Sequence, residues 1–277
     1  MKKAHRHYEE RKMKNNALRI VSWNCHYGFY GEKTKVLKEY DADILVIPEC
    51  REMDMEESGY VEKYRDWWGD HKEATDNSGN VNKKNDLGVG VFWKDGITVT
   101  QLPQWKETLS KNNDFRYLIP YKVEGNFELF TLIAVWTKNK MDVCDPLDYV
   151  QKAHAAVDHY KSIGLLDGLV ILIGDFNSNS IWDNCYRKEY NHSALVKKLK
   201  QMEIKDCSGS FEKYNTYYYY YNSKEYSVVD DYCFASAKMY KSAKFSVPDS
   251  DKWISENGKK RWRGLSDHCP IIIDFTF

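Results

Sequence analysis

A carboxylate and an amide stand two positions apart at the end of an apolar run. The run Leu169 to Ile173 is followed by Gly174, Asp175, Phe176 and Asn177. A buried strand that ends in a glycine, which frees the turn, would present Asp175 and Asn177 together at a sheet edge. There Asp175 would polarise a water molecule while Asn177 holds a phosphate oxygen. Because Asp and Asn are also common turn residues, the motif alone is only suggestive.

Three other strand ends carry polar groups of similar chemistry. Asn24 follows the first expected strand, Glu49 follows the second, and Ser266, Asp267 and His268 precede the last. Amide and carboxylate oxygens are hard ligands that suit Mg²⁺, which takes one or two carboxylates with water and phosphate. His268 adds a nitrogen that titrates near neutral pH. Each residue alone has an ordinary alternative as a cap, a helix start or a loop residue, so only the ordered set indicates chemistry.

The elements that must position these residues follow from apolar patterning. Strands are predicted at 18–23, 44–48, 88–93, 97–102, 116–123, 127–136, 169–173, 216–221, 228–235 and 270–277, and helices at 33–40, in part of 52–68, and at 146–163 and 193–202. We expect Pro48 to end the second strand and 97–102 to pair with 88–93 as a hairpin. The tyrosine-rich strand 216–221 is given no catalytic role. No repeat or linker divides the pattern, which predicts one α/β domain over residues 18–277.

The composition is that of a folded protein with balanced charge. The chain has 277 residues, of which 42% are hydrophobic, and its 41 basic residues match its 41 acidic ones, so a polyanion site must come from local clustering. Seven cysteines without a CxxC spacing argue against disulfides or zinc and favour a cytoplasmic setting, with Cys25, Cys50, Cys233 and Cys269 in the core. No apolar run could span a membrane. Residues 1–17 are expected to form a basic tail or surface helix.

In five ordered motifs the chain resembles the endonuclease/exonuclease/phosphatase superfamily, which includes DNase I-like and exonuclease III-like nucleases and inositol-phosphate and sphingomyelin phosphodiesterases. The motifs are Trp23-Asn24, Pro48-Glu49-Cys50, Gly174-Asp175-Phe176-Asn177, Asp231-Tyr232 and Ser266-Asp267-His268. The resemblance covers residues 18–277. It implies a DNase I-like four-layer α/β sandwich, in which two packed mixed β-sheets are flanked by helices, with a Mg²⁺-dependent phosphoester hydrolase site where Mn²⁺ would substitute.

The resemblance also implies a role for each motif residue. In the superfamily pattern Asp175 orients or deprotonates the attacking water and Asn177 holds the scissile phosphate. His268 stabilises charge in the transition state, and Asp231 holds its ring. Such a site meets the needs of phosphodiester cleavage, which are an in-line water, a Lewis acid and donors aimed at the phosphate oxygens.

The implied metal ligands come with one departure from the pattern. Glu49 would be the principal ligand, with help from Asn24 and Asp267. Many members carry an acidic residue two positions after the first Asn, and here that position is His26. Either the site therefore lacks a second metal ligand at this position, or another residue supplies it.

A second departure concerns the end of strand 127–136. Members usually place His or Tyr there, whereas this chain has Trp136, whose indole offers one N–H donor and no acceptor. Either that N–H or Lys138 replaces the missing donor, or activity is reduced; Trp136 is structural or stacks on substrate. Arg116 is a further expected phosphate contact, because its planar guanidinium matches two oxygens.

Three functions remain open from the sequence. The first is a Mg²⁺-dependent nuclease with DNA or RNA as the expected partner and no required protein partner. The second keeps the reaction but takes a small phosphoester, such as an inositol phosphate, a phospholipid head group or a nucleotide. The third is a scaffold that binds nucleic acid or protein without turnover, which His26 and Trp136 motivate.

Overall fold

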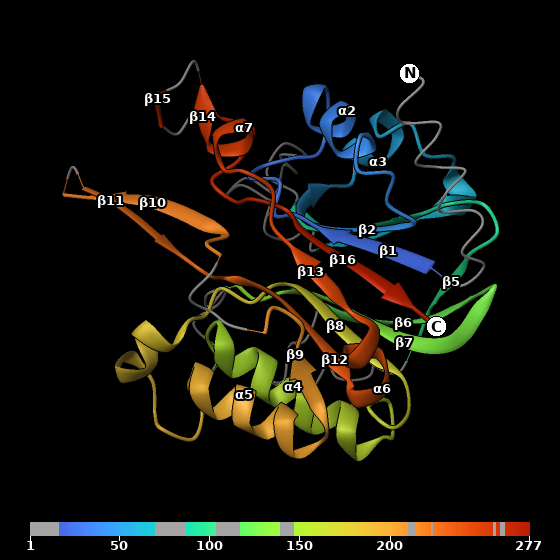
Figure 1. Ribbon diagram of the computed structural model, residues 1–277, viewed down its shortest axis with the longest axis vertical. Helices are drawn as coiled ribbons and strands as arrows, with labels where there is room; N and C mark the ends of the chain where they lie inside the picture. The colour runs from blue at the N-terminus through green and yellow to red at the C-terminus, as the bar shows by residue number, and fades with distance from the viewer. Residues whose placement is uncertain are drawn as a thin grey trace, which may run out of the picture.

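Two six-stranded mixed β-sheets pack face to face, with helices on their outer faces (Figure 1). The computed structural model describes residues 17–69, 87–103, 117–138, 147–209, 214–222, 224–256, 259–260 and 264–277. The predicted four-layer sandwich is confirmed. The expected basic tail over 1–17 falls almost wholly outside the described residues.

Each sheet contains one parallel pair of neighbouring strands at its centre. The first sheet has the order β13 (Lys244–Ser246), β16 (Ile271–Thr276), β1 (Ala17–Ser22), β2 (Ile44–Arg51), β4 (Leu87–Trp93) and β3 (Arg65–Gly69). The second has the order β5 (Thr98–Gln101), β6 (Leu118–Gly125), β7 (Phe127–Trp136), β8 (Val170–Asp175), β12 (Asp231–Ser236) and β9 (Ile204–Asp206). Strands β1 and β2 are parallel, as are β7 and β8, so each pair needs a crossover connection.

Helices supply those connections and cover the sheets. Helices α2 (Glu32–Lys38) and α3 (Asp54–Glu57) lie over the first sheet, and α4 (Val150–Ser162) and α5 (His192–Gln201) lie over the second (Figure 1). The remaining elements are α6 (Ala237–Ser242), α7 (Asp251–Ile254), the 3₁₀ turns Glu62–Tyr64 and Ser180–Cys185, and the ribbons β10 (Tyr217–Tyr221) with β11 (Lys224–Val228) and β14 (Ser255–Glu256) with β15 (Lys259–Lys260). Within the described part of the chain, no helix is both long and apolar enough to cross a membrane.

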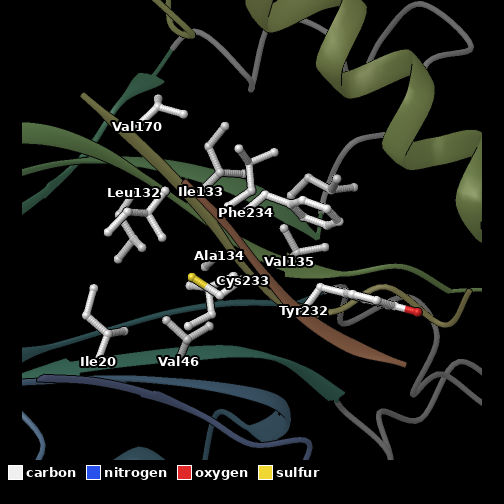
Figure 2. Packing of buried hydrophobic residues seen from close by; sticks show 14 of the residues in the cluster. Ile20, Val46, Leu132, Ile133, Ala134, Val135, Val170, Tyr232, Cys233 and Phe234 are labelled. Carbon is white, nitrogen blue, oxygen red and sulfur yellow. The ribbon is translucent and has the colours of Figure 1, made fainter. Parts of the chain in front are cut away.

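The alternation of side chains along a strand divides the core of the first sheet into two clusters. On β2, Ile44 and Val46 belong to the cluster between the sheets, whereas Leu45 and Ile47 pack on the outer face with α2. Figure 2 shows Val46 pointing from the first sheet toward the second. Apolar residues therefore run without interruption along this strand because both of its faces are covered.

Several predicted elements differ from the structure. Strand β2 does not end at Pro48 but continues to Arg51, because its pairing with β4 resumes at Cys50 and Arg51 after a bulge at Glu49. The strand in 97–102 pairs with β6 and not with 88–93. The helical prediction for 52–68 holds only for the short α3, since β3 occupies its last part.

Other predictions are confirmed. The strands predicted at 116–123 and 127–136 are present as β6 and β7, which pair antiparallel. The four cysteines assigned to the core are free and buried, and Cys207 is buried as well.

Gly174 sets how closely β8 approaches β7 just before the polar motif. Its φ is +146°, and a Cβ at this position would lie 1.9 Å from the backbone oxygen of Val135 on β7. No side chain fits there without moving a backbone strand. The glycine is therefore needed for the register that places Asp175 beside Trp136.

We predict that Gly174→Ala lowers the free energy of unfolding by about 3 kcal/mol or more, because the clash is with backbone and adds to the cost of positive φ. Gly96 is the control, since its φ is +86° but a Cβ there meets nothing within 4 Å. Gly96→Ala should cost about 1 kcal/mol. Urea denaturation of both variants measures the difference, and equal losses would contradict the role of close strand approach.

Candidate active site

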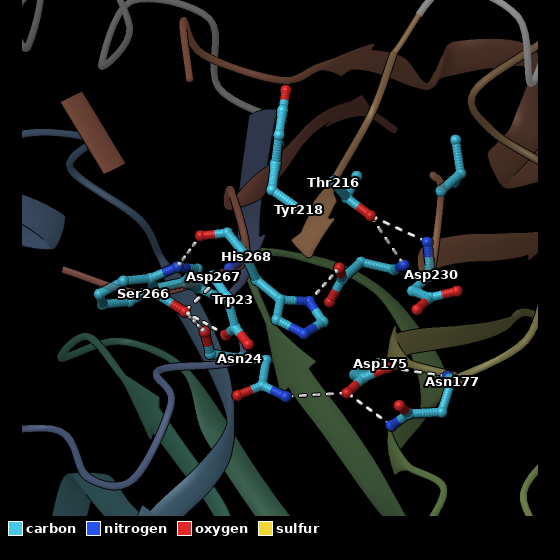
Figure 3. A network of polar contacts seen from close by, with 12 residues as sticks. Trp23, Asn24, Asp175, Asn177, Thr216, Tyr218, Asp230, Ser266, Asp267 and His268 are labelled. Carbon is cyan, nitrogen blue, oxygen red and sulfur yellow. Dashed lines mark hydrogen bonds and ion pairs between the residues drawn. The ribbon is translucent and has the colours of Figure 1, made fainter. Parts of the chain in front are cut away.

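The loops that follow the parallel strands of both sheets meet at one place and bring the predicted polar residues together (Figure 3). Asn24 after β1 donates from Nδ2 to Asp175 Oδ2 at 2.8 Å and to Glu49 Oε1 at 3.1 Å. These contacts join β1, β2 and β8, so they cross between the two sheets. Ligand sites in α/β sheets commonly lie outside the carboxyl ends of parallel strands, which is where this cluster lies.

Asp175 is the centre of the cluster. Its carboxylate is fully buried and accepts hydrogen bonds from the backbone N–H of Asn177, from Asn177 Nδ2 and from Asn24, each at 2.8 Å. Burial raises the pKa of Asp175 to about 7, with a further contribution from the charge of Asp231 against an opposing one from His268. A carboxylate with a pKa near neutrality can take a proton from water at physiological pH.

His268 and Asp231 form a buried ion pair beside Asp175. The ring nitrogen Nδ1 of His268 donates to Asp231 Oδ2 at 2.8 Å, and both side chains are almost completely buried. Burial alone would lower the pKa of His268, but the carboxylates of Asp231, Asp175 and Asp267 outweigh it and raise the pKa well above its ordinary value. The imidazole is therefore held as a cation, oriented by Asp231.

Glu49 reaches the cluster because the backbone of β2 bulges. The register of β2 against β4 shifts between Pro48 and Cys50, and Glu49 adopts a φ of +59°. Its second carboxylate oxygen, Oε2, accepts from the backbone N–H of Tyr27 at 3.0 Å. Non-glycine residues at positive φ are strained, and such strain concentrates at functional sites. Asn177, at a φ of +43°, is a second example within the same cluster.

The donor set of this cluster suits a hard divalent cation. Glu49 supplies a half-buried carboxylate and Asn24 an amide in contact with it, which is a fitting partial ligand set for Mg²⁺, an ion that keeps several waters. Among the described residues, no group of three or more His, Cys, Asp or Glu side chains forms a ready metal site. The residues therefore fit an ion that water and substrate must help to coordinate.

His26 takes the place of a metal ligand and binds one of the expected ligands instead. Its Nδ1 lies 3.1 Å from Asp267 Oδ1. The hydrogen bond to Asp267 raises the pKa of His26, and the charge of Glu49 adds to this effect. The protonated form of His26 is thus favoured by Asp267 and Glu49.

Two residues of the cluster were missed by sequence reasoning. Thr216 Oγ1 accepts from the backbone N–H groups of Asp230 and Asp231, each at 3.0 Å, and so fixes the start of β12. Asp230 is 1% exposed, and its Oδ1 has no hydrogen-bond partner within the described part of the chain. Burial and then the charge of Asp175 raise the pKa of Asp230 well above its usual range. The acidic doublet before Tyr232 was a visible signal for Asp230, whereas nothing local marked Thr216.

The predicted substrate contacts are less complete. Trp136 is 3% exposed and packs edge-on against Tyr117 at 5.0 Å, so its ring belongs to the core. Lys138 places Nζ 4.5 Å from the centre of the Trp136 ring, at the rim of the cluster. Arg116 lies outside the described residues. Contacts of Trp136, Lys138 and Arg116 with substrate stay predictions.

Comparisons with known proteins identify the family. The model of the Endonuclease/Exonuclease/phosphatase family matches residues 21–268, so the chain belongs to this family. Members of the family are generally hydrolases of phosphoester bonds and typically depend on divalent metals. A search of curated proteins finds no match.

Solved structures show the same fold at low sequence identity. The endonuclease domain of TRAS1, a telomere-specific non-LTR retrotransposon, has a TM-score of 0.59 at 14% identity, covering 94% of this chain and 99% of that domain. The Xenopus laevis APE2 catalytic domain has a TM-score of 0.58 at 18% identity, covering 94% and 92%. The Bacteroides thetaiotaomicron mannosyl-6-phosphatase Bt3783 has a TM-score of 0.53 at 16% identity, covering 94% and 100%.

We predict that Asp231→Asn lowers the pKa of His268 from well above its ordinary value to near or below it. Burial lowers this pKa, and the variant lacks the carboxylate that most strongly raises it. The pair stabilises the fold below the ordinary histidine pKa near 6.5, and its contribution is lost as pH rises through the raised folded pKa. At pH 6 the variant should therefore lose roughly 3 kcal/mol of unfolding free energy.

Ring ¹⁵N chemical shifts of the histidines, recorded without divalent metal, measure this change. His192 is an internal control, since burial lowers its pKa to about 4 and the charge of Asp183 offsets this only in part. It should stay neutral in both proteins over the same range. A His268 titration that is unchanged by Asp231→Asn would contradict the ion pair.

Proposed function

We propose that this protein is a Mg²⁺-dependent phosphodiesterase that hydrolyses the backbone of DNA or RNA, with Mn²⁺ able to replace Mg²⁺. One observation carries the proposal: Asn24, Glu49 and Asp175 lie in a single hydrogen-bonded group, although 151 positions separate Asn24 from Asp175. The His268–Asp231 pair lies beside this group. Metal ligand, base and cation would then act on one phosphate.

Asp175 would act as the general base. Its oxygens are fixed by three N–H donors, and its pKa of about 7 lets it accept a proton from a water molecule near neutral pH. The water oxygen forms the new bond to phosphorus, its proton goes to Asp175, and the bond from phosphorus to the leaving oxygen breaks. Fixed orientation of the base lowers the entropic cost of this step.

His268 and Asn177 would stabilise the phosphate oxygens. The His268 ring is held as an imidazolium before substrate arrives, so little reorganisation accompanies the build-up of negative charge. Asn177 Nδ2 donates to Asp175 and to the backbone oxygen of Thr137 at 2.9 Å, which holds its amide next to the base. His268 would bind a non-bridging oxygen of the scissile group, and Asn177 would do the same once one of its two N–H groups leaves its present acceptor.

Glu49 and Asn24 are the residues that would hold the metal, with Asp267 as a further ligand once its contact with His26 is released. A bound Mg²⁺ supplies Lewis acidity, which stabilises charge on the phosphoryl oxygens. His26 occupies Asp267 through its hydrogen bond, so a second metal would have to displace it from this carboxylate.

Nucleic acid is the proposed substrate class. Support comes from the TRAS1 endonuclease domain, which shares the whole fold with this chain. A small phosphoester is the second candidate, because the fold is also shared with a mannosyl-6-phosphatase. The balanced net charge of the chain favours neither. A cleavage assay distinguishes the two.

We predict that the wild type cleaves at least one of supercoiled, single-stranded or abasic DNA, or RNA, in the presence of Mg²⁺. Asp175→Asn should reduce the rate by at least about 100-fold, because an amide cannot take the proton from water. Asp158→Asn is the matched control, since Asp158 is exposed on α4 and pairs only with Lys198 among the contacts described. It should cleave at the wild-type rate.

The outcomes separate the candidates. A folded Asp175→Asn protein that keeps a near wild-type rate would remove Asp175 from the mechanism. If the wild type cleaves none of these nucleic acids but releases phosphate from inositol phosphates or nucleotides, the small-phosphoester function replaces the nuclease.

We also predict that Mg²⁺ binds with heat that Glu49→Ala abolishes or weakens at least tenfold, because Glu49 is the half-buried carboxylate of the proposed ligand set. Glu128→Ala is the control, since Glu128 is an exposed glutamate near the opposite end of β7. Calorimetric titration without substrate measures both. Absence of Mg²⁺ binding in the wild type would favour a binding scaffold that does not catalyse.

A further inference from the structure

The hairpin of β10 and β11 extends from the body of the protein beside the active-site cluster (Figure 1). Its backbone begins at the cluster itself. Tyr218 N–H donates to the backbone oxygen of Asp267 at 2.9 Å, and Cys269 N–H donates to that of Thr216 at 2.7 Å. The hairpin is therefore paired at its base with the chain segment that carries His268.

One face of this hairpin carries a row of stacked rings that starts at the catalytic histidine. The ring of Tyr217 lies 4.7 Å from that of His268, with an angle of 33° between the planes. Tyr219 stacks on Tyr217 at 5.4 Å and 19°, and Tyr226 stacks on Tyr219 at 5.3 Å and 16°. We call Tyr217, Tyr219 and Tyr226 the tyrosine row.

The row is not a buried part of the core. Tyr217 and Tyr219 are half-buried, and Tyr226 at the outer end is 39% exposed. By the register of the hairpin, exposed Lys224 lies farther out on the same face. The alternate face packs on the protein body through Tyr218, which contacts the outer core cluster of the first sheet. The hairpin thus has one anchoring face and one face of accessible rings that ends in a cation.

We propose that the tyrosine row is a binding subsite for the unpaired bases of a nucleic acid strand next to the scissile phosphate. The inference rests on the proposed nuclease function and adds to it a preference for single-stranded over duplex nucleic acid. A row that begins at His268 starts where the phosphate would be held, so the bases that follow that phosphate would run along the hairpin. Aromatic side chains bind bases of any sequence because every base has a π-face.

The accessible rings favour an unpaired strand over a duplex. Bases within a duplex are stacked on each other, so their faces are not open to side chains, whereas single-stranded bases can stack on tyrosine. Lys224 beyond Tyr226 would contact a backbone phosphate, as cations along single-strand grooves do. Unpaired DNA and unpaired RNA share this chemistry, and the test below uses both.

The test measures binding without cleavage. A 12-nucleotide strand containing 2-aminopurine, as DNA and as RNA, is titrated with the protein in EDTA, and both fluorescence quenching and anisotropy are recorded. We expect the wild type to quench the probe and to bind it more tightly than the matching duplex. Tyr219→Thr/Tyr226→Thr should weaken binding by about tenfold per ring and abolish the quenching.

Each tyrosine substitution is chosen to change the rings and to leave the hairpin backbone intact. Threonine keeps the β-strand preference of the positions while removing the rings. Tyr226→Thr alone is the safer variant, because Tyr226 is at the exposed end and does not contact His268. Glu225→Thr is the control, since Glu225 lies on the other face of the same strand. It should bind and quench as the wild type does.

Outcomes for binding and cleavage are separable. Equal binding and quenching by wild type, Tyr226→Thr and the double variant would overturn the subsite, even if the wild type cleaves nucleic acid. Tighter binding of duplex than of single strands by the wild type would also overturn it. Ring-dependent binding by a protein that cleaves no nucleic acid would support the subsite and refute the proposed nuclease.

Discussion

The charge balance of a buried cluster constrains the rest of the active site. Asp175, Asp230 and Asp231 are at most 1% exposed, and His268, which is 4% exposed, is the cation that pairs with Asp231. Buried carboxylates without compensating charge are costly, so the ion pair between His268 and Asp231 has to form if Asp175 is to ionise at all. The remaining imbalance explains why the pKa values of both Asp175 and Asp230 are raised by burial. Burial and the neighbouring carboxylates thus leave Asp175 with a pKa of about 7 and raise the pKa of His268.

The two packed sheets stabilise the fold enough to hold these buried charged groups. The strands beneath the site are buried on both faces and are held by long apolar runs, so the polar groups occupy only their ends. A rigid sheet end can carry local strain, and here Glu49 and Asn177 sit at positive φ where their side chains are needed. Gly174 also helps to position the site, because it allows β8 to approach β7 closely. The sheets therefore stabilise the fold, and the strand ends and loops position the polar residues of the cluster.

The sequence predicted the fold class and the identity of the central residues, because strand-end motifs and apolar runs are local signals. It did not predict contacts that depend on pairing between distant segments. Pro48 suggested the end of a strand, yet the bulge after it is what aims Glu49 into the site. Strand β5 pairs with β6 because sheet partners are chosen by the packing of the whole sandwich. Thr216 was missed for the same reason, since its role depends on backbone groups 14 and 15 positions away.

Thr216 also shows why the hairpin and the active site should be treated as one unit. Its hydroxyl fixes the backbone before Asp231, its backbone oxygen pairs with Cys269, and the next residue, Tyr217, stacks on His268. Three contacts from two consecutive residues therefore tie the hairpin to both members of the ion pair. A strand bound along the tyrosine row would press on the ring whose charge the proposed mechanism requires, so substrate binding and orientation of the imidazolium would be coupled. The hairpin would then contribute to the chemistry through this contact, although it would supply no ionised group of its own at the scissile phosphate.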